Sequence, residues 1–302
     1  MIPLIWKAMF WSVSQFNICE LSLVSYIIAN WFPNNQQYEL NNQNIQKDNC
    51  ITIKFIDKNT RSNMMKFLTW NIKDGGVLDF NNPKVDNIDN ILNIIKKENP
   101  DVIVIQEYQS EFYNELIRDG LNKLFYTHTV CEDHPDKTLR KRVLIASKEP
   151  FETIDTTTNI LDYSKRNWRE IIVSNNSVHV LGVHVPLATT TNLYGETKDN
   201  KREKKIFLDA LKEKFIEYKN SEDPCMICGD FNLHEGAVYK EYLDDFANCL
   251  TEVTSKEATH GNYKFDYVFV NDAFKRLIKT EDIFSAHQTI FLDHSYLCIE
   301  IA

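Results

Sequence analysis

The chain has 302 residues, of which 43% are hydrophobic and 25% are charged, with a formal net charge of −9. This composition suits a globular core and excludes a disordered chain. The negative charge argues against a broad basic surface for polyanions, although a small basic groove is compatible with it.

The seven cysteines are scattered along a chain that is long enough to bury a core without disulfides. We therefore expect reduced thiols and a cytoplasmic protein. Cys225 and Cys228 form a Cys-x-x-Cys pair inside an apolar run that is typical of a strand, where their side chains point in opposite directions. Because no second such pair follows, we interpret these cysteines as structural and not as a zinc site.

The first 63 residues differ in character from the rest of the chain. Residues 1–33 are apolar and aromatic, and residues 34–50 are rich in Asn and Gln. The apolar stretch Leu21–Phe32 is too short to span a bilayer, so we predict no stable membrane span. Three interpretations of residues 1–63 remain open: a docked accessory segment, a membrane-associated segment, or an extension outside the true gene start. We assign 1–63 as an N-terminal extension and 64–302 as one domain.

From Met65 onward, short apolar runs alternate with amphipathic segments. Ile88, Ile91, Leu92 and Ile95 recur at the helical spacing i, i+3, i+4, i+7, which predicts an amphipathic helix. In chain order, the pattern predicts strands at 66–70, 102–105, 143–146, 169–173, 178–183, 226–228, 265–270 and 296–301, and helices at 84–98, 110–124 and 201–218. This alternation indicates a single α/β domain of about 240 residues.

Polar side chains stand where the predicted strands begin or end. Four apolar strands run directly into a polar residue at their carboxyl ends, and two later strands begin just after one. If the later strands run antiparallel to the first four, all of these side chains gather at one edge. The residues are Asn71, Glu107, His184 and Asp230, with Asn232 two positions on, and then Asp266, Asp293 and His294.

The chemistry of such a set is that of a metal-dependent hydrolase. Carboxylate and carboxamide oxygens are hard ligands that suit Mg²⁺ or Mn²⁺. Histidines add proton transfer and hydrogen bonds to charged oxygens. The combination fits hydrolysis of a phosphate ester by an in-line water. Taken singly, each residue is more ordinarily a turn or helix-cap residue, so the hypothesis depends on the joint pattern.

Basic and aromatic residues supply candidates for substrate binding. Arg140, Lys141 and Arg142 precede a predicted strand and form either a solvated loop or a grip on a substrate phosphate. Trp168 and Arg169 are candidates for lining the cleft. For Arg169 the alternative is an ion pair with the neighbouring Glu170. The remaining histidines at 128, 134, 179, 260 and 287 have no evident partner in the sequence.

Together these motifs resemble those of the endonuclease/exonuclease/phosphatase superfamily, which includes DNase I-like nucleases, abasic-site endonucleases, sphingomyelinases and inositol-phosphate phosphatases. The resemblance covers roughly residues 65–302. It departs from the family pattern at Lys148 in the run Val143–Pro150, where arginine is usual, on both sides of His184, and at Leu292, where serine is usual. The motifs are Thr69-Trp70-Asn71-Ile72, Gln106-Glu107, Gly182-Val183-His184-Val185-Pro186, Gly229-Asp230-Phe231-Asn232, Phe265-Asp266-Tyr267-Val268 and Leu292-Asp293-His294.

The resemblance implies a fold and a role for each residue. The fold is a four-layer DNase I-like α/β sandwich, in which two mixed β-sheets pack face to face with helices outside. Glu107 resembles the principal metal ligand, with Asn71 and Asp293 close to the metal. Asp230 resembles the group that orients or deprotonates the attacking water. Asn232 and His184 resemble the pair that binds the phosphate oxygens. His294 resembles an acid/base or charge-stabilising group, and Asp266 resembles the residue that polarises it. How the base and acid duties are divided stays open.

We therefore expect a divalent-metal-dependent phosphodiester hydrolase whose substrate is a phosphoester, with nucleic acid, DNA or RNA, as the leading candidate. The nuclease assignment comes from the family analogy. One alternative is a phosphatase or phosphodiesterase for a small phosphoester or a phospholipid headgroup. Another is an inactive binding module that kept the fold. No obligate protein partner is evident.

Overall fold

The computed structural model divides the chain into two units, 1–64 and 65–302. In the first unit, β1 (Tyr38–Leu40) pairs antiparallel with β2 (Ile53–Phe55). The apolar segment Leu21–Phe32 and the predicted substrate-binding residue Arg140 lie outside the described residues, so the role of 1–63 stays a prediction. The structure describes residues 38–40, 53–55, 65–76, 87–109, 114–132, 141–155, 160–173, 177–191, 195–278, 285–290 and 292–301.

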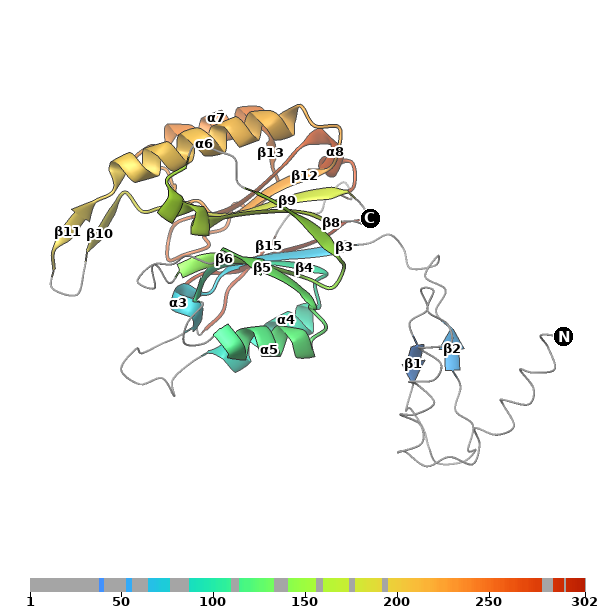
Figure 1. Cartoon of the computed structure of the whole chain (residues 1–302). Helices are drawn as coiled ribbons and strands as arrows, with labels where there is room; N and C mark the ends of the chain where they lie inside the picture. The colour runs from blue at the N-terminus through green and yellow to red at the C-terminus, as the bar shows by residue number, and fades with distance from the viewer. Residues whose placement is uncertain are drawn as a thin grey trace, which may run out of the picture. The chain divides into compact units, whose positions relative to one another are not determined.

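The second unit contains two six-stranded mixed sheets that pack face to face (Figure 1). The first sheet has the order β15-β16-β3-β4-β6-β5, and the second has the order β13-β14-β12-β9-β8-β7. The strands of the first sheet are β3 (Met65–Asn71), β4 (Val102–Gln109), β5 (His128–Cys131), β6 (Lys141–Ser147), β15 (Ser285–His287) and β16 (Tyr296–Ile301). Those of the second are β7 (Phe151–Ile154), β8 (Trp168–Val173), β9 (Val178–His184), β12 (Cys225–Asp230), β13 (Thr251–Glu252) and β14 (Asp266–Val270).

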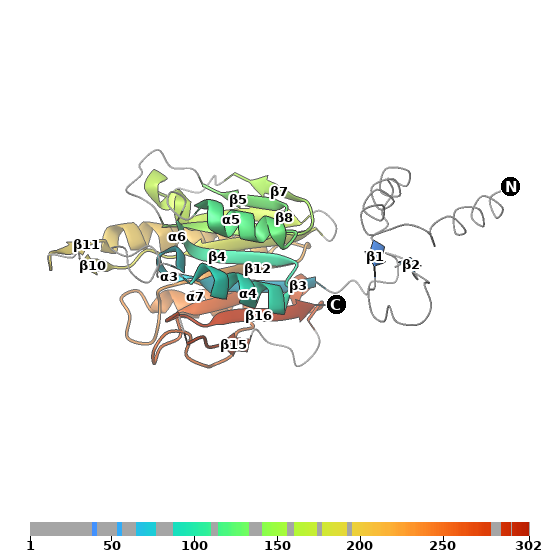
Figure 2. The same ribbon diagram turned by 90° about the horizontal axis from the view of Figure 1, so that it is seen from below.

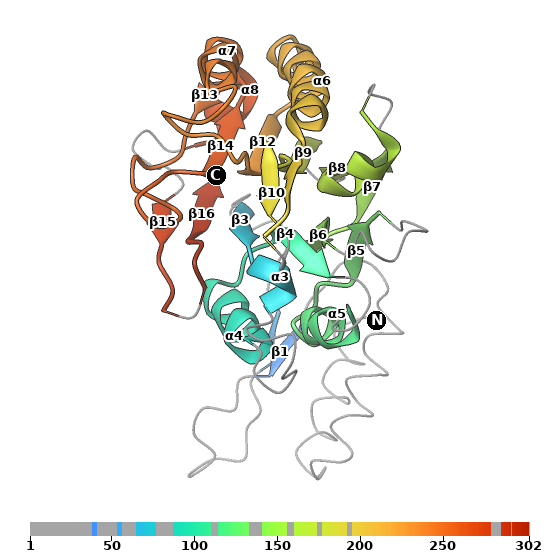
Figure 3. The same cartoon turned by 90° about the vertical axis from the view of Figure 1, so that its left-hand side faces the viewer.

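Helices cover the outer face of each sheet. Two of them, α4 (Ile88–Glu98) and α5 (Asn114–Lys123), lie on the first sheet (Figure 2). On the second sheet lie α6 (Lys201–Lys219) and α7 (Glu241–Cys249), so that Figure 3 shows four layers edge-on. Short helices α3 (Lys73–Gly76), η2 (Asp162–Asn167) and α8 (Asp272–Lys275) and a hairpin of β10 (Thr189–Thr191) and β11 (Thr197–Asp199) complete this unit. The predicted four-layer fold is confirmed.

Strand β4 shows why the sheets stack in this way. Its side chains alternate between two apolar environments, and nearly all of them are buried. Val102 and Val104 point into the core between the sheets, whereas Ile103 and Ile105 pack under the outer helices. Each such buried aliphatic side chain stabilises the fold by about 1.5–3 kcal/mol relative to an exposed one. A strand that is apolar on both faces therefore has to be covered on both faces.

Strand direction brings the polar residues to one edge. Strands β3 and β4 are parallel in the first sheet, as are β9 and β12 in the second. Strand β16 runs antiparallel to β3, and β14 runs antiparallel to β12. The carboxyl ends of the first four strands therefore lie beside the amino ends of the last two, as the sequence predicts.

Several local expectations are refined by the structure. Cys225 and Cys228 lie in different cores on opposite faces of β12, as the strand pattern predicts. Short elements such as β5, β7 and the β10–β11 hairpin are not evident from the sequence because they have few apolar residues.

Within the described residues, no helix has the length and apolar character needed to cross a membrane.

Candidate active site

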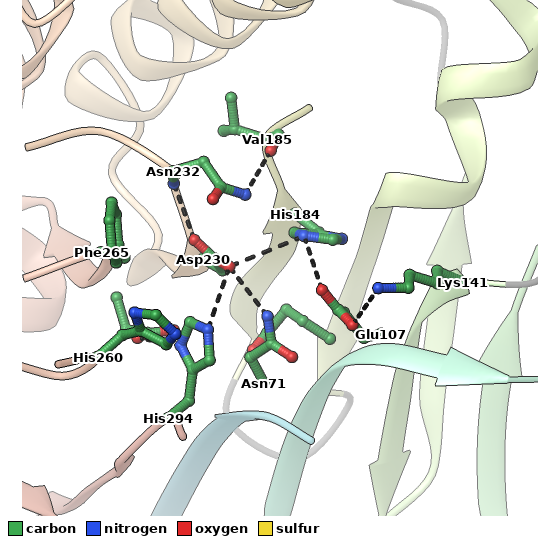
Figure 4. A network of polar contacts seen from close by, with 12 residues as sticks. Asn71, Glu107, Lys141, His184, Val185, Asp230, Asn232, His260, Phe265 and His294 are labelled. Atoms are coloured by element: carbon green, nitrogen blue, oxygen red, sulfur yellow. Dashed lines mark hydrogen bonds and ion pairs between the residues drawn. The ribbon is translucent and has the colours of Figure 1, made fainter. Parts of the chain in front are cut away.

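A cleft of about 490 Å³ opens at the edge where these strands end, a size typical of small-ligand sites. Six of the polar residues predicted at strand ends line it: Glu107, His184, Asp230, Asn232, Asp293 and His294. The other two are buried and bonded to lining residues, Asn71 to Asp230 and Asp266 to His294. Figure 4 shows Asn71, Asp230 and His184 close together in this network. Its lining includes Lys73, Asp74, Glu107, Lys141, Arg166, Asn167, His184, Thr190, Asn200, Glu203, Asp230, Asn232, His260, Phe265, Asp293 and His294.

Glu107 is turned into the cleft by its backbone. The β4–β6 pairing shifts register between Ile105 and Tyr108, and Glu107 has a φ of 58°, which non-glycine residues rarely adopt. Its Oε2 accepts hydrogen bonds from Lys141 Nζ at 2.6 Å and from the backbone N–H of Asp74 at 2.8 Å. Burial raises the pKa of Glu107, but His184 and Lys141 outweigh it and lower the pKa to about 2. The carboxylate is thus ionised at neutral pH.

Asp230 lies at the centre of the floor. Asn71 Nδ2 donates to its Oδ2 at 2.9 Å, and the backbone N–H of Asn232 donates to its Oδ1 at 2.8 Å. Burial and the nearby Asp266 carboxylate raise the pKa of Asp230. The preceding Gly229 has a φ of 138°, and a Cβ there would lie 2.0 Å from the carbonyl oxygen of Val183. Only glycine fits this position, which explains the Gly-Asp-Phe-Asn motif.

His184 bridges the two halves of the floor. Its Nε2 lies 3.7 Å from Oε1 of Glu107, which comes from the first sheet, and 3.7 Å from Oδ2 of Asp230, which comes from the second. The ring is largely buried. With its proton on Nε2, the ring can donate between these two carboxylates.

His294 and Asp266 form a close pair. His294 Nδ1 lies 2.9 Å from Asp266 Oδ2, and its Nε2 lies 4.0 Å from Asp230 Oδ2. Burial lowers the pKa of His294, but Asp266 outweighs this effect and raises it to about 9. Asp266 is held in turn by Thr259 Oγ1, which accepts its backbone N–H at 3.0 Å. The ring of His294 is therefore an oriented imidazolium at neutral pH.

Asp293 lies on the rim beside Lys73 and His260. Its Oδ2 lies 2.6 Å from Lys73 Nζ and 3.5 Å from His260 Nε2. The His260 and His294 rings lie 4.6 Å apart between centroids. Burial raises the pKa of Asp293, whereas the hydrogen bond and charge of Lys73 together with the charge of His294 outweigh this and lower it. His260 does have partners, so the expectation of none is wrong; its bridge to His294 links positions 34 residues apart in the sequence.

Two of the predicted metal ligands offer the hard oxygen donors that a divalent cation prefers. Glu107 and Asp293 carry ionised carboxylates, and each forms an ion pair with a lysine. The third, Asn71, is fully buried, and its Oδ1 accepts the backbone N–H of Lys73 at 2.9 Å. Among the described residues, one ligand atom each from His260, Asp293 and His294 also lies within 4.8 Å of the others. Oxygen-rich donors favour Mg²⁺ or Mn²⁺, and the two imidazoles extend the set toward Mn²⁺.

The structure corrects part of the predicted substrate-binding set. Lys141 lines the cleft, whereas Arg142, Trp168 and Arg169 are 3%, 0% and 5% exposed and do not. The two arginines pair with Glu132: Arg142 donates to its backbone carbonyl and Arg169 to its carboxylate. Trp168 packs on Phe207 of α6. These three side chains therefore have structural contacts. The two arginines can be buried because Glu132 supplies a partner for each of them.

Other cleft residues give no signal in the sequence. Lys73 and Asp74 follow Asn71 on a turn in which both have positive φ, and Arg166 and Asn167 end the short helix η2. None of them follows an apolar strand. The adjacent glycines at 75 and 76 are the one available hint, since they mark a tight turn after the Asn71 motif.

Comparison with known proteins shows the family of the chain. The sequence matches the model of the endonuclease/exonuclease/phosphatase family over residues 68–286, which is more than half of the chain. A search of curated proteins by sequence finds no match.

Solved structures share the fold at low sequence identity. An AP endonuclease from Archaeoglobus fulgidus superposes with a TM-score of 0.59 at 13% identity, covering 78% of this chain and 98% of that one. The 3'-5' exonuclease NExo from Neisseria meningitidis gives 0.56 at 16%, covering 78% and 98%. TDP2 from C. elegans gives 0.53 at 15%, covering 79% and 75%. The chain therefore belongs to the endonuclease/exonuclease/phosphatase family, a family of phosphoesterases.

Proposed function

We propose that the protein is a divalent-metal-dependent phosphodiester hydrolase that acts on nucleic acid through a small footprint. The observation that carries the proposal is the ionised Glu107 carboxylate beside Asp230 and the Asp266–His294 pair in one cleft. This arrangement combines a ligand for a hard cation, a group that can bind the attacking water and an oriented acid.

In this mechanism, Glu107, Asn71 and Asp293 would hold Mg²⁺ or Mn²⁺, which would supply charge stabilisation at the phosphate. Asp230 accepts a hydrogen bond from the attacking water and takes its proton as the new phosphorus–oxygen bond forms. Asn232 Nδ2 keeps one N–H beyond its bond to Val185 O for a phosphate oxygen, and His184 Nε2 donates to another.

His294 completes the reaction as the acid or charge-stabilising group. Its protonated Nε2 donates to the leaving oxygen or to the negative charge that develops as the ester bond breaks, while Asp266 holds Nδ1. His294 Nε2 also lies near Asp230. The proton that Asp230 takes from water can therefore pass to His294, which restores both residues to their starting protonation states.

An aromatic face beside the cleft supports a nucleic-acid substrate. Phe265 lines the cleft, and the His234 ring lies 5.2 Å from it between centroids. Tyr263, which is 54% exposed, lies 4.5 Å from His234. Partly exposed rings of this kind can stack on unpaired bases irrespective of sequence. Arg142 and Arg169 are buried and add nothing to a surface that could track a long duplex.

The small number of exposed lysines in the cleft lining favours a second candidate, hydrolysis of a small phosphoester. Lys73 and Lys141 are the cleft lysines that reach solvent, being about half and two-fifths exposed in their side chains. They are enough for one or two phosphates but not for a long polyanion.

A substrate panel separates the two candidates. Single- and double-stranded DNA, RNA, abasic duplex and phosphorylated headgroups are incubated with Mg²⁺ or Mn²⁺, and we expect metal-dependent cleavage of single-stranded oligonucleotides. Tyr263→Ser should raise KM for an oligonucleotide about tenfold and leave a small chromogenic diester unaffected. Phe125→Ser, at an aromatic 77% exposed outside the cleft lining, is the matched control. Turnover of small phosphoesters alone would replace the nuclease proposal with the second candidate.

A further inference from the structure

Asn167 is a buried polar residue that the mechanism above does not use. It ends the helix η2 immediately before β8, is 4% exposed and lines the cleft. Its side-chain oxygen Oδ1 is buried and accepts no hydrogen bond. Buried polar atoms are paired in the great majority of cases, and an unpaired one on a cleft wall indicates the place of a ligand group.

A second unpaired polar atom lies on the neighbouring strand. Trp168 pairs with Val183 in the β8–β9 ladder, and continuing this register sets Asn167 opposite His184. His184 Nδ1 is also buried without a partner. The facing residues Asn167 and His184 thus each carry a buried polar atom without a partner.

Two neighbouring cleft residues already have partners. Glu203 Oε1 accepts from Ser164 Oγ at 2.8 Å, which ties η2 to α6. Asn200 Nδ2 donates to Thr190 Oγ1 at 3.1 Å. These bonds hold this part of the wall in place, and Asn167 Oδ1 is left for a donor that a substrate brings into the cleft.

We propose that Asn167 is a specificity-determining residue whose Oδ1 accepts a hydrogen bond from a hydroxyl group on the ring next to the scissile phosphate. The enzyme then prefers ribose, or another hydroxylated ring, over the deoxy counterpart. This inference rests on phosphoester hydrolysis in this cleft, as proposed above. Sites that bond a substrate hydroxyl reject the analogue that lacks it, because the site's own polar group is left buried and unpaired.

The test compares matched substrates in competition. A short DNA oligonucleotide is paired with versions carrying one ribonucleotide on either side of the cleaved bond, and myo-inositol phosphate is paired with cyclohexyl phosphate. We expect the hydroxylated member of the pair that is turned over to be preferred about tenfold or more. Asn167→Leu should reduce that preference to below about threefold, and Asn167→Asp, which keeps an acceptor, should retain it.

A preference ratio is insensitive to the amount of folded protein, since both substrates meet the same enzyme molecules. Asn200→Leu, at a cleft asparagine whose side chain is already bonded, is the matched control and should leave the ratio unchanged. Equal turnover of both members of each pair by the wild type, or an unchanged ratio in Asn167→Leu, overturns the inference. Preference for inositol phosphate with no oligonucleotide cleavage upholds it and overturns the nuclease proposal instead.

Discussion

Lys141 places its ammonium nitrogen 2.6 Å from Oε2 of Glu107 and 2.8 Å from Oδ1 of Asp74. A lysine thus holds the carboxylate that we propose as the principal metal ligand. Burial lowers the pKa of Lys141, but Glu107 outweighs this and raises it, so the ammonium group stays charged. Lys141 is therefore both a counter-ion for the Glu107 carboxylate and a competitor of any cation that binds there.

Replacing Glu107 should remove metal-dependent activity. Glu107→Gln keeps the shape of the side chain but loses the anionic oxygen that a hard cation requires. We expect activity to fall at least about a thousandfold, equivalent to several kcal/mol of lost charge stabilisation. Steady-state kinetics with and without excess chelator provide the measurement. Full activity of the variant, or of the wild type in chelator, would contradict the metal mechanism.

Removing Lys141 should tighten metal binding. Lys141→Met keeps the length of the side chain and removes the competing charge. Because the side chain is 40% exposed, solvent screening weakens the competition, and we expect Mn²⁺ to bind about three- to tenfold more tightly. Titration followed by electron paramagnetic resonance measures this directly without a substrate. Weaker Mn²⁺ binding in the variant would show instead that Lys141 supports the site.

His294 and Asp266 should act as one unit. General acid–base catalysis contributes about 10²–10⁴-fold, and residues that work as a unit lose activity non-additively. His294→Ala, Asp266→Ala and the double variant are therefore expected to fall within about tenfold of one another in kcat/KM. If the two single losses multiply in the double variant, the two side chains work independently.

The pH profile should report the pKa of His294. Burial lowers this pKa and Asp266 raises it to about 9, so the imidazolium persists below that pH and is lost above it. Activity that needs the acid should therefore fall as pH rises through about 9. In Asp266→Asn, the alkaline limb should move toward about 6.5, the ordinary histidine value. An alkaline limb that stays in place would exclude His294 as the titrating group.

Arg169 should contribute to stability more than to substrate binding. It is 5% exposed and pairs with Glu132, so Arg169→Ala leaves that carboxylate without its partner. We expect a loss of roughly 2–3 kcal/mol in the free energy of unfolding, measured by urea denaturation. Arg202→Ala, at an exposed arginine on α6, should change stability by less than about 0.5 kcal/mol. Unchanged stability with a raised KM would return Arg169 to the substrate-binding set.

The sequence by itself determined the layered α/β fold and the central residues of the site. Apolar periodicity is a local property, so α4 and α6 and the double-faced strand β4 are readable without a structure. The same holds for Glu107 and Asp230, because each follows a buried strand and parallel strands deliver their carboxyl ends to one edge. The sequence shows the Gly-Asp-Phe-Asn motif, and the backbone geometry at Gly229 explains why its first residue is glycine.

The tertiary structure alone decided which charged side chains reach the cleft. Arg142 and Lys141 are adjacent in the sequence, yet one is buried against Glu132 and the other holds Glu107, because neighbours on a strand face opposite sides. His260 joins His294 only through a bridge between distant segments. Such pairings depend on long-range packing and on where buried charge finds a partner, and neither leaves a periodic trace in the sequence.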